Sequence, residues 1–238
     1  MKMLRMLTLT EARLLLREPL AFFWGVAFPM VLLTVMGLSA SKIDGVSLVA
    51  IYEPIVIAFI SVAFGVQGIP VQIAGYRQGR ILRRLATTPA GPARVIGAQL
   101  IVSLAVIFIA TVGVLAVGRL GFGVPLPRQP AGFALVVILS AAAMVAIGLL
   151  IGALAPNARS AGAAATVLFF PLMYFAGLWT PQMSATAKNI GQFTPLGAAT
   201  QALNSSMTGG WPHPAAFAVV CGTAIVCVGL AARFFRWE

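Results

Sequence analysis

Six stretches of the chain, each about 20 residues long, contain no charged side chain. They run over residues 20–40, 54–74, 95–117, 132–155, 161–180 and 213–232. A bilayer core about 30 Å thick is crossed by a helix of about 20 apolar residues, so each stretch is long enough to span a membrane. The mean hydropathy of +0.99 over 238 residues is also well above that of a soluble domain. The sequence therefore predicts an all-α integral membrane protein with six transmembrane helices.

The segments between these spans are too short to form a soluble domain. Residues 41–53, 118–131 and 156–160 are brief linkers rich in Gly, Pro, Asn or Ser. Residues 181–212 are longer, but their apolar pieces are too short to cross a bilayer. We expect this segment to form short extracellular helices that lie at the membrane surface or re-enter it. The whole chain, residues 1–238, is then a single transmembrane domain.

The distribution of Lys and Arg predicts the orientation of the chain. If both termini are cytoplasmic, twelve of the 16 cations lie on the inner side: Lys2, Arg5, Arg13, Arg17, Arg77, Arg80, Arg83, Arg84, Arg94, Arg159, Arg233 and Arg236. The outer side then holds Lys42, Arg119, Arg128 and Lys188. Such an excess of cytoplasmic cations is typical of plasma-membrane proteins. The net charge of +11 is thereby explained without a nucleic-acid partner. The excess of Arg over Lys, together with abundant Ala and Gly, suggests a high-GC bacterium, so we expect the bacterial inner membrane as the location.

Ionisable groups are scarce in the apolar stretches. Glu53 precedes the stretch 54–74, and we expect it to lie at the outer margin of that span. His213 stands between two prolines, and Cys221 and Cys227 lie in an apolar run. Ion-coupled transport uses ionisable ligands within the membrane, and enzymes need a catalytic constellation. We therefore expect no catalytic, metal or cofactor site. An ion-coupled secondary transporter and a non-transporting scaffold are the alternatives to an externally driven permease.

Residues 75–89, with the sequence GYRQGRILRRLATTP, concentrate the positive charge. On a helical wheel the arginines fall within an arc of about 120°, opposite an apolar face. The two groups are Arg77, Arg80, Arg83 and Arg84, and Ile81, Leu82 and Leu85. This pattern predicts a short cytoplasmic helix. Its arginine face fits anionic headgroups or a cytosolic partner protein.

Several motifs follow one another in a recognisable order. They are Arg17-Glu18-Pro19 before the first span, residues 76–89, PLMYFAGLWTPQM at 171–183, FTPLGAATQAL at 193–203 and the final RFFRWE. Together with the six spans they resemble the ABC-2 type permeases, the membrane subunits of ATP-binding-cassette exporters that include the daunorubicin-type drug exporters. The resemblance covers nearly the whole chain. Family members usually carry an acidic residue just before the glycine of the cytoplasmic motif, where this chain has Gln78.

The resemblance implies a division of labour between subunits. Residues 75–89 would be a coupling helix seated on a separate ATPase subunit, beside an interfacial helix at residues 1–19. The coupling residues would be Arg77, Gly79, Arg80, Leu82, Arg83, Arg84, Leu85 and Pro89. The chain has no GxxxxGK[ST] phosphate loop. ATP and Mg²⁺ would therefore bind to the partner, present in two copies, and the permease itself would form a homodimer.

The resemblance also implies that spans two and five line the path of the cargo. Gln67 is a polar group in span two, and Phe170, Tyr174 and Phe175 are aromatic residues of span five. We expect these four residues to contact a hydrophobic or amphipathic cargo such as a drug, lipid or glycolipid, although packing between helices would also explain the rings. Gly148 and Gly152 form a GxxxG pair that predicts a close helix contact, either within one subunit or between two.

Overall fold

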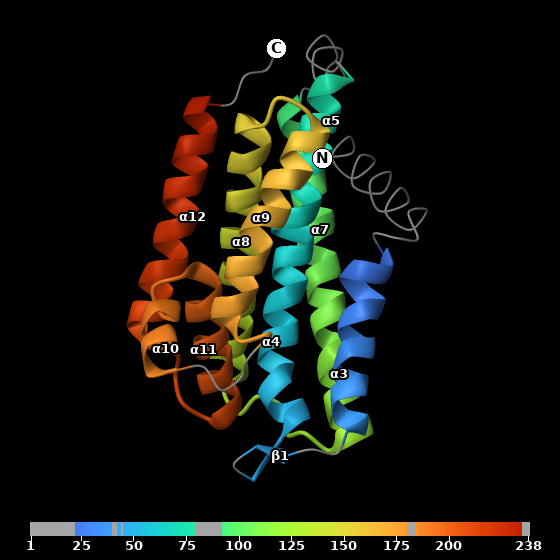
Figure 1. Cartoon of the computed structure of the whole chain (residues 1–238), viewed down its shortest axis with the longest axis vertical. Coiled ribbons are helices and arrows are strands. Elements are labelled where there is room, and N and C mark those ends of the chain that lie inside the picture. Colours follow the sequence, from blue (N-terminus) through green and yellow to red (C-terminus); the bar gives the residue numbers. More distant parts are fainter. Residues whose placement is uncertain (1–21, 40–41, 44, 80–91, 180–183, 235–238) are drawn as a thin grey trace.

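The computed structural model describes residues 22–39, 42–43, 45–79, 92–179 and 184–234. Its helices form an elongated bundle with roughly parallel long axes (Figure 1). Within the described residues, five helical segments are long and apolar enough to cross a membrane, namely Leu48–Gln78, Gly97–Gly121, Pro130–Leu154, Ala158–Ala176 and Pro214–Phe234. A shorter apolar helix, Phe23–Leu38, precedes them. The predicted all-α membrane fold is confirmed.

The first span consists of a π-helical turn, η1 (Phe23–Ala27), followed by α3 (Phe28–Leu38). A two-stranded antiparallel hairpin then joins β1 (Lys42–Ile43) to β2 (Val46–Ser47). Gly45 has a φ of 81° in the hairpin turn, a backbone conformation that favours glycine. The sequence predicted only an irregular linker here.

The second span is longer than predicted. It runs through α4 (Leu48–Val62), the π-helical turn η2 (Ala63–Gly68) and α5 (Ile69–Gln78) without interruption. The hydroxyl of Ser47 accepts a hydrogen bond from the backbone N–H of Ala50 at 3.4 Å and caps the start of α4. Pro70 lacks a backbone N–H, and the π-helical turn ends two residues before it, at Gly68.

The remaining four spans include α8, which packs against most of the other helices. The third span is α7 (Pro92–Ala116) with the π-helical turn η3 (Val117–Gly121), the fourth is α8 (Pro130–Leu154), the fifth is α9 (Ala158–Ala176) and the sixth is α12 (Pro214–Phe234). Helix α8 packs against α12, α4, η2 and α5. The predicted GxxxG contact lies within this subunit, because a Cβ on Gly148 would overlap the carbonyl oxygen of Gly65 and one on Gly152 would lie 3.2 Å from the Ile73 Cβ.

Two short helices occupy the segment between the fifth and sixth spans. They are α10 (Ala185–Gly191) and α11 (Pro195–Thr208), each capped by a side-chain hydroxyl. Helix α11 packs against α8, α9, α12 and α4, and Leu196 and Leu203 are fully buried. The expectation of short helices holds for the described residues, and α11 is an integral part of the bundle.

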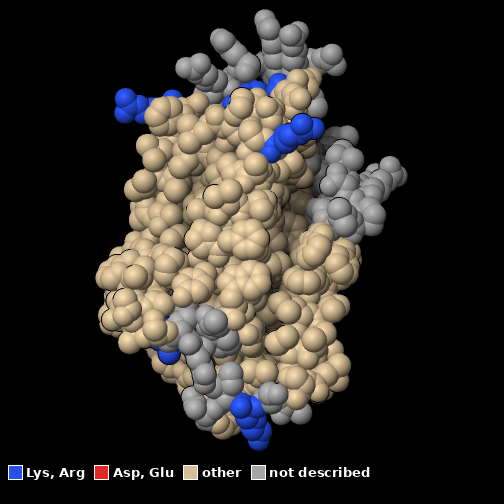
Figure 2. Space-filling view, viewed as in Figure 1, with Lys and Arg blue, Asp and Glu red and all other residues tan. Residues whose placement is uncertain are grey.

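The described cations lie toward the two ends of the bundle. The arginine end carries Arg77, Arg159 and Arg233, at the ends of α5, α9 and α12. The hairpin end carries Lys42, Arg119, Arg128 and Lys188. Figure 2 shows a broad uncharged belt between the ends on the face that it displays. This sorting agrees with the predicted partition of the loops into two sides.

Candidate functional site

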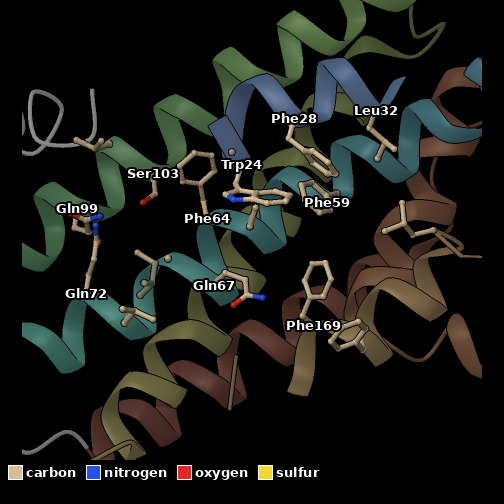
Figure 3. A pocket seen from close by; sticks show the side chains of 18 of the residues that line it. Trp24, Phe28, Leu32, Phe59, Phe64, Gln67, Gln72, Gln99, Ser103 and Phe169 are labelled. Atoms are coloured by element: carbon tan, nitrogen blue, oxygen red, sulfur yellow. The ribbon is translucent and has the colours of Figure 1, made fainter. Parts of the chain in front are cut away.

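A cavity of about 780 Å³ opens between the first, second, third and fifth spans. Figure 3 shows side chains from these spans directed into it. Its volume lies in the range of small-molecule sites. The middle and the hairpin-side part are aromatic, whereas the part nearest the arginine end carries polar side chains. None of the described residues lining it is Asp, Glu, Lys, Arg or His.

Six aromatic side chains form a continuous row along the cavity. Neighbouring ring centroids are 4.8 Å apart for Trp24 and Phe28, 5.5 Å for Phe28 and Phe59, 6.0 Å for Phe59 and Phe169, 5.7 Å for Phe169 and Phe170, and 6.2 Å for Phe170 and Trp179. These spacings are favourable for ring pairs. We call this set the aromatic row. It connects three spans, so its geometry depends on how they pack together.

Amide and hydroxyl groups line the other part of the cavity. Gln72 lies on α5 and Gln99 and Ser103 on α7, and the two amides extend toward one another in Figure 3. The Gln99 side chain is only 9% exposed. The Oε1 atoms of Gln72 and Gln99 are both buried without a hydrogen-bond partner among the described residues. Such buried polar atoms usually have a partner in folded proteins.

The four residues expected on the cargo path separate into two pairs. Gln67 and Phe170 line the cavity, and Phe170 stacks on Trp179 with an angle of 18° between the ring planes. Tyr174 and Phe175 do not belong to the lining. They lie near the end of α9, where their rings pack edge to face at 5.4 Å. The role of all four in transport remains a prediction.

Sequence reasoning missed most of the cavity. Gln72, Gln99 and Ser103 are polar residues inside otherwise apolar stretches, a signal that could have identified them in the same way as Gln67. The rings of Trp24, Phe28 and Phe59 had no such signal, because aromatic residues are common in any apolar span. Only the packing of the spans brings them together.

A second constellation lies at the arginine end. Arg77 donates one hydrogen bond to the carbonyl oxygen of Ala153 at 3.1 Å and another to that of Ala155. These carbonyls close the C-terminus of α8, where a cation also interacts favourably with the helix dipole. Gln78 accepts a long hydrogen bond of 3.5 Å from the backbone N–H of Ala158, at the start of α9. We call these contacts the α5 brace, because they tie the end of α5 to the turn between α8 and α9.

The brace changes the interpretation of the predicted coupling segment. Helix α5 extends to Gln78, and Gly79 caps it by donating to the carbonyl oxygen of Gly75 at 2.9 Å. Arg77 therefore belongs to the second span, and its side chain faces α8. The other expected coupling residues, Arg80, Leu82, Arg83, Arg84, Leu85 and Pro89, lie outside the described residues, as does the expected interfacial helix at residues 1–19.

Glu53 was predicted at the margin of the second span. It lies instead inside α4. It is 1% exposed, because α4 begins at Leu48 and turns this side chain into the bundle. A Cβ on Gly118 would lie 3.0 Å from the Glu53 Cδ, so the carboxyl group packs directly on η3. Its Oε2 atom has no hydrogen-bond partner among the described residues. The Glu53 carboxyl group therefore lies in the apolar interior. The sequence argument against ion-coupled transport assumed that this group lay at the outer margin of the span.

Other reactive side chains form no cluster in the described part of the chain, where no group of three His, Cys, Asp or Glu residues could hold a metal ion. His213 is exposed at the turn before α12, and its Nδ1 accepts a hydrogen bond of 3.4 Å from the backbone N–H of Ala215. Cys221 and Cys227 are free and half-buried on α12.

Comparison with known proteins identifies the family. No curated protein matches the chain. The family described as ABC-2 type transporter, however, matches residues 3–208. This region includes the cavity, the aromatic row and the α5 brace. The chain therefore belongs to the ABC-2 type transporter family, whose members are the membrane-embedded components of ABC transporters.

Proposed function

We propose that the chain is the permease of an ABC exporter that moves a hydrophobic or amphipathic molecule from the inner leaflet or the cytoplasm to the outside. The observation that carries this proposal is the 780 Å³ cavity inside a chain of this family, with its aromatic row and with no charged residue among the described residues that line it. Because an apolar ring surface adapts to many ligands, such a cavity fits drugs, lipids or glycolipids.

The energy for transport comes from a separate ABC ATPase, which binds ATP and Mg²⁺. We propose that two copies of the permease assemble with two ATPase subunits and that the arginine end faces the cytoplasm. The α5 brace supports this arrangement, because a movement imposed on the segment after Gln78 would reach α8 through Arg77 and α9 through Gln78. Exposed apolar side chains on α7 and α9, such as Phe108 and Val167, provide surface for lipid or for a second copy.

Transport in inverted membrane vesicles tests this proposal. The chain is coexpressed with an ABC ATPase that copurifies with it, and uptake of a fluorescent neutral amphipath is followed after addition of ATP. We expect ATP-dependent uptake that requires both subunits and is lost when the phosphate-loop Lys of the ATPase is replaced by Ala.

The same vesicles distinguish the ion-coupled alternative. Uptake that survives the ATPase substitution but disappears with a protonophore would refute ATP-driven export. Loss of this protonophore-sensitive uptake in Glu53→Gln would then assign the coupling to the buried carboxyl group. Uptake independent of both energy sources, or equal in vesicles lacking the chain, would refute transport by this protein.

A further inference from the structure

We propose that the cavity selects an uncharged amphipathic ligand that has a hydroxyl- or amide-bearing head at Gln72 and Gln99 and a planar ring beside the aromatic row. This inference rests on the proposed function and defines the substrate class of the same cavity. It concerns equilibrium binding, so it can be tested without the ATPase.

The two amides determine the chemistry of the head. The Oε1 atoms of Gln72 and Gln99 are buried and unpaired within the described structure, and Gln99 is nine-tenths buried. A buried amide oxygen without a partner is unfavourable, and a hydrocarbon ligand would leave it so. Each amide can both donate and accept a hydrogen bond. A hydroxyl or amide group on the ligand has the same two capacities, and Ser103 provides a further hydroxyl in the lining.

The absence of fixed charge from the described lining determines the charge of the ligand. Among the described residues of the lining, an anion would find no Lys or Arg partner and a cation no carboxylate. The aromatic rings would attract a cation, but the free energy of this attraction is smaller than the hydration free energy that an unpaired ion loses on burial. A neutral head with several hydrogen-bonding groups has no such cost.

The positions of the rings and amides determine how the ligand lies. Gln72 is six residues before the end of α5, so the polar part of the cavity faces the arginine end. Trp24, Phe28 and Phe59 lie apart from Gln72 and Gln99 in Figure 3. Phe59 is on α4, the part of the second span that follows the hairpin, whereas Gln72 is on α5. We therefore place the head toward the arginine end and the planar ring deeper in the bundle.

Binding of matched coumarin probes tests the inference in the full chain, reconstituted in phosphatidylcholine–phosphatidylglycerol bilayer discs. Trp24 is kept as the fluorescence donor, and the other three tryptophans, Trp179, Trp211 and Trp237, are replaced by Phe. The probes share one ring. They are 4-methylumbelliferyl β-glucoside, the corresponding glucuronide, a trimethylammonioethyl ether and a hexyl ether.

We expect saturable energy transfer to the glucoside, with an apparent Kd at least tenfold lower than for the glucuronide or the cation. Gln99→Leu and Gln72→Leu should each raise the Kd of the glucoside about tenfold, which equals about 1.4 kcal/mol, without changing the signal of the hexyl ether. Gln201→Leu is the matched control, because Gln201 is exposed on α11 and does not line the cavity.

Three results would overturn the inference. The cation or the glucuronide could bind as tightly as the glucoside, the Gln99→Leu and Gln201→Leu proteins could behave alike, or the signal could rise linearly with probe per lipid, which indicates partition into the bilayer. Selective binding without ATP-driven uptake in vesicles would refute the transport proposal alone. Uptake of charged probes would refute the ligand class alone.

Discussion

Replacing Arg77 by Ala tests whether the α5 brace holds the turn between α8 and α9. The substitution removes two hydrogen bonds from a charged donor to the carbonyl oxygens of Ala153 and Ala155. Hydrogen bonds that involve a charged group contribute about 1.5–3 kcal/mol each. Because Arg77 is half-buried and water can replace part of the interaction, we expect a loss of about 1.5–3 kcal/mol for the pair together.

Hydrogen exchange at the turn measures this loss directly. The backbone N–H of Ala155 donates to Ile151 at 2.9 Å and that of Ala161 to Asn157 at 3.0 Å, so both report opening of the turn. Since 1.4 kcal/mol corresponds to a factor of ten, the exchange of these amides should accelerate roughly 10- to 150-fold in Arg77→Ala, whereas the middle of α8 should not change.

Two further variants make the experiment specific. Arg159→Ala removes a cation from the same turn, but Arg159 is exposed and we expect exchange within about twofold of the wild type. Arg77→Lys keeps the charge but loses the planar fork that reaches two acceptors, and should give an intermediate rate. Equal exchange in Arg77→Ala and Arg159→Ala would show that Arg77 does not stabilise the turn.

Three other experiments address the cavity, the buried carboxyl group and the orientation. Phe170→Ala should change the cargo concentration for half-maximal ATPase stimulation about two- to tenfold, because ring pairs contribute about 0.5–1.5 kcal/mol, whereas Phe193→Ala, at an exposed ring outside the lining, should not; no change in Phe170→Ala would place the Phe170 ring in packing alone. Gly118→Ala should lower thermal stability through its overlap with Glu53, and adding Glu53→Ala should restore part of it; a coupling energy below about 0.5 kcal/mol would contradict this contact. In a protein lacking Cys221 and Cys227, a cysteine at Ser184 should react with an impermeant thiol reagent in whole cells and one at Asn157 should not; the opposite pattern would reverse the orientation.

The long spans were predictable, because a run of about 20 apolar residues has few alternatives to a membrane helix. Helix boundaries that depend on local hydrogen bonds were harder to predict from the sequence. Ser47 caps α4, which begins at Leu48, six residues before the predicted start at residue 54. The sequence analysis assigns Glu53 to the margin of the span, next to Pro54. Asn157 and Ser160 form a capping box that begins α9 inside a segment predicted to be a linker.

The arrangement of the site was hard to predict for a different reason. The helical wheel treated Arg77 and Arg80 as residues of one short helix, but Gly79 ends α5 between them. Gln67 and Phe170 were predictable as cavity residues, because they are a polar group and a ring on the spans that the family resemblance indicates. The aromatic row joins residues more than 150 positions apart, from Trp24 to Trp179, and no local pattern encodes that proximity.

The contact between Gly65 and Gly148 restricts the motions available during a transport cycle. Any side chain at Gly148 would overlap the Gly65 carbonyl oxygen, and a Cβ on Gly65 would lie 2.6 Å from the carbonyl carbon of Met144. Two backbones this close cannot slide past each other by a helical turn without collision. We therefore expect the second and fourth spans to travel as one rigid block. In the proposed transport cycle, access to the cavity would then change through displacement of the first, third or fifth span against this block, or through rotation of the block against its counterpart in the proposed second copy.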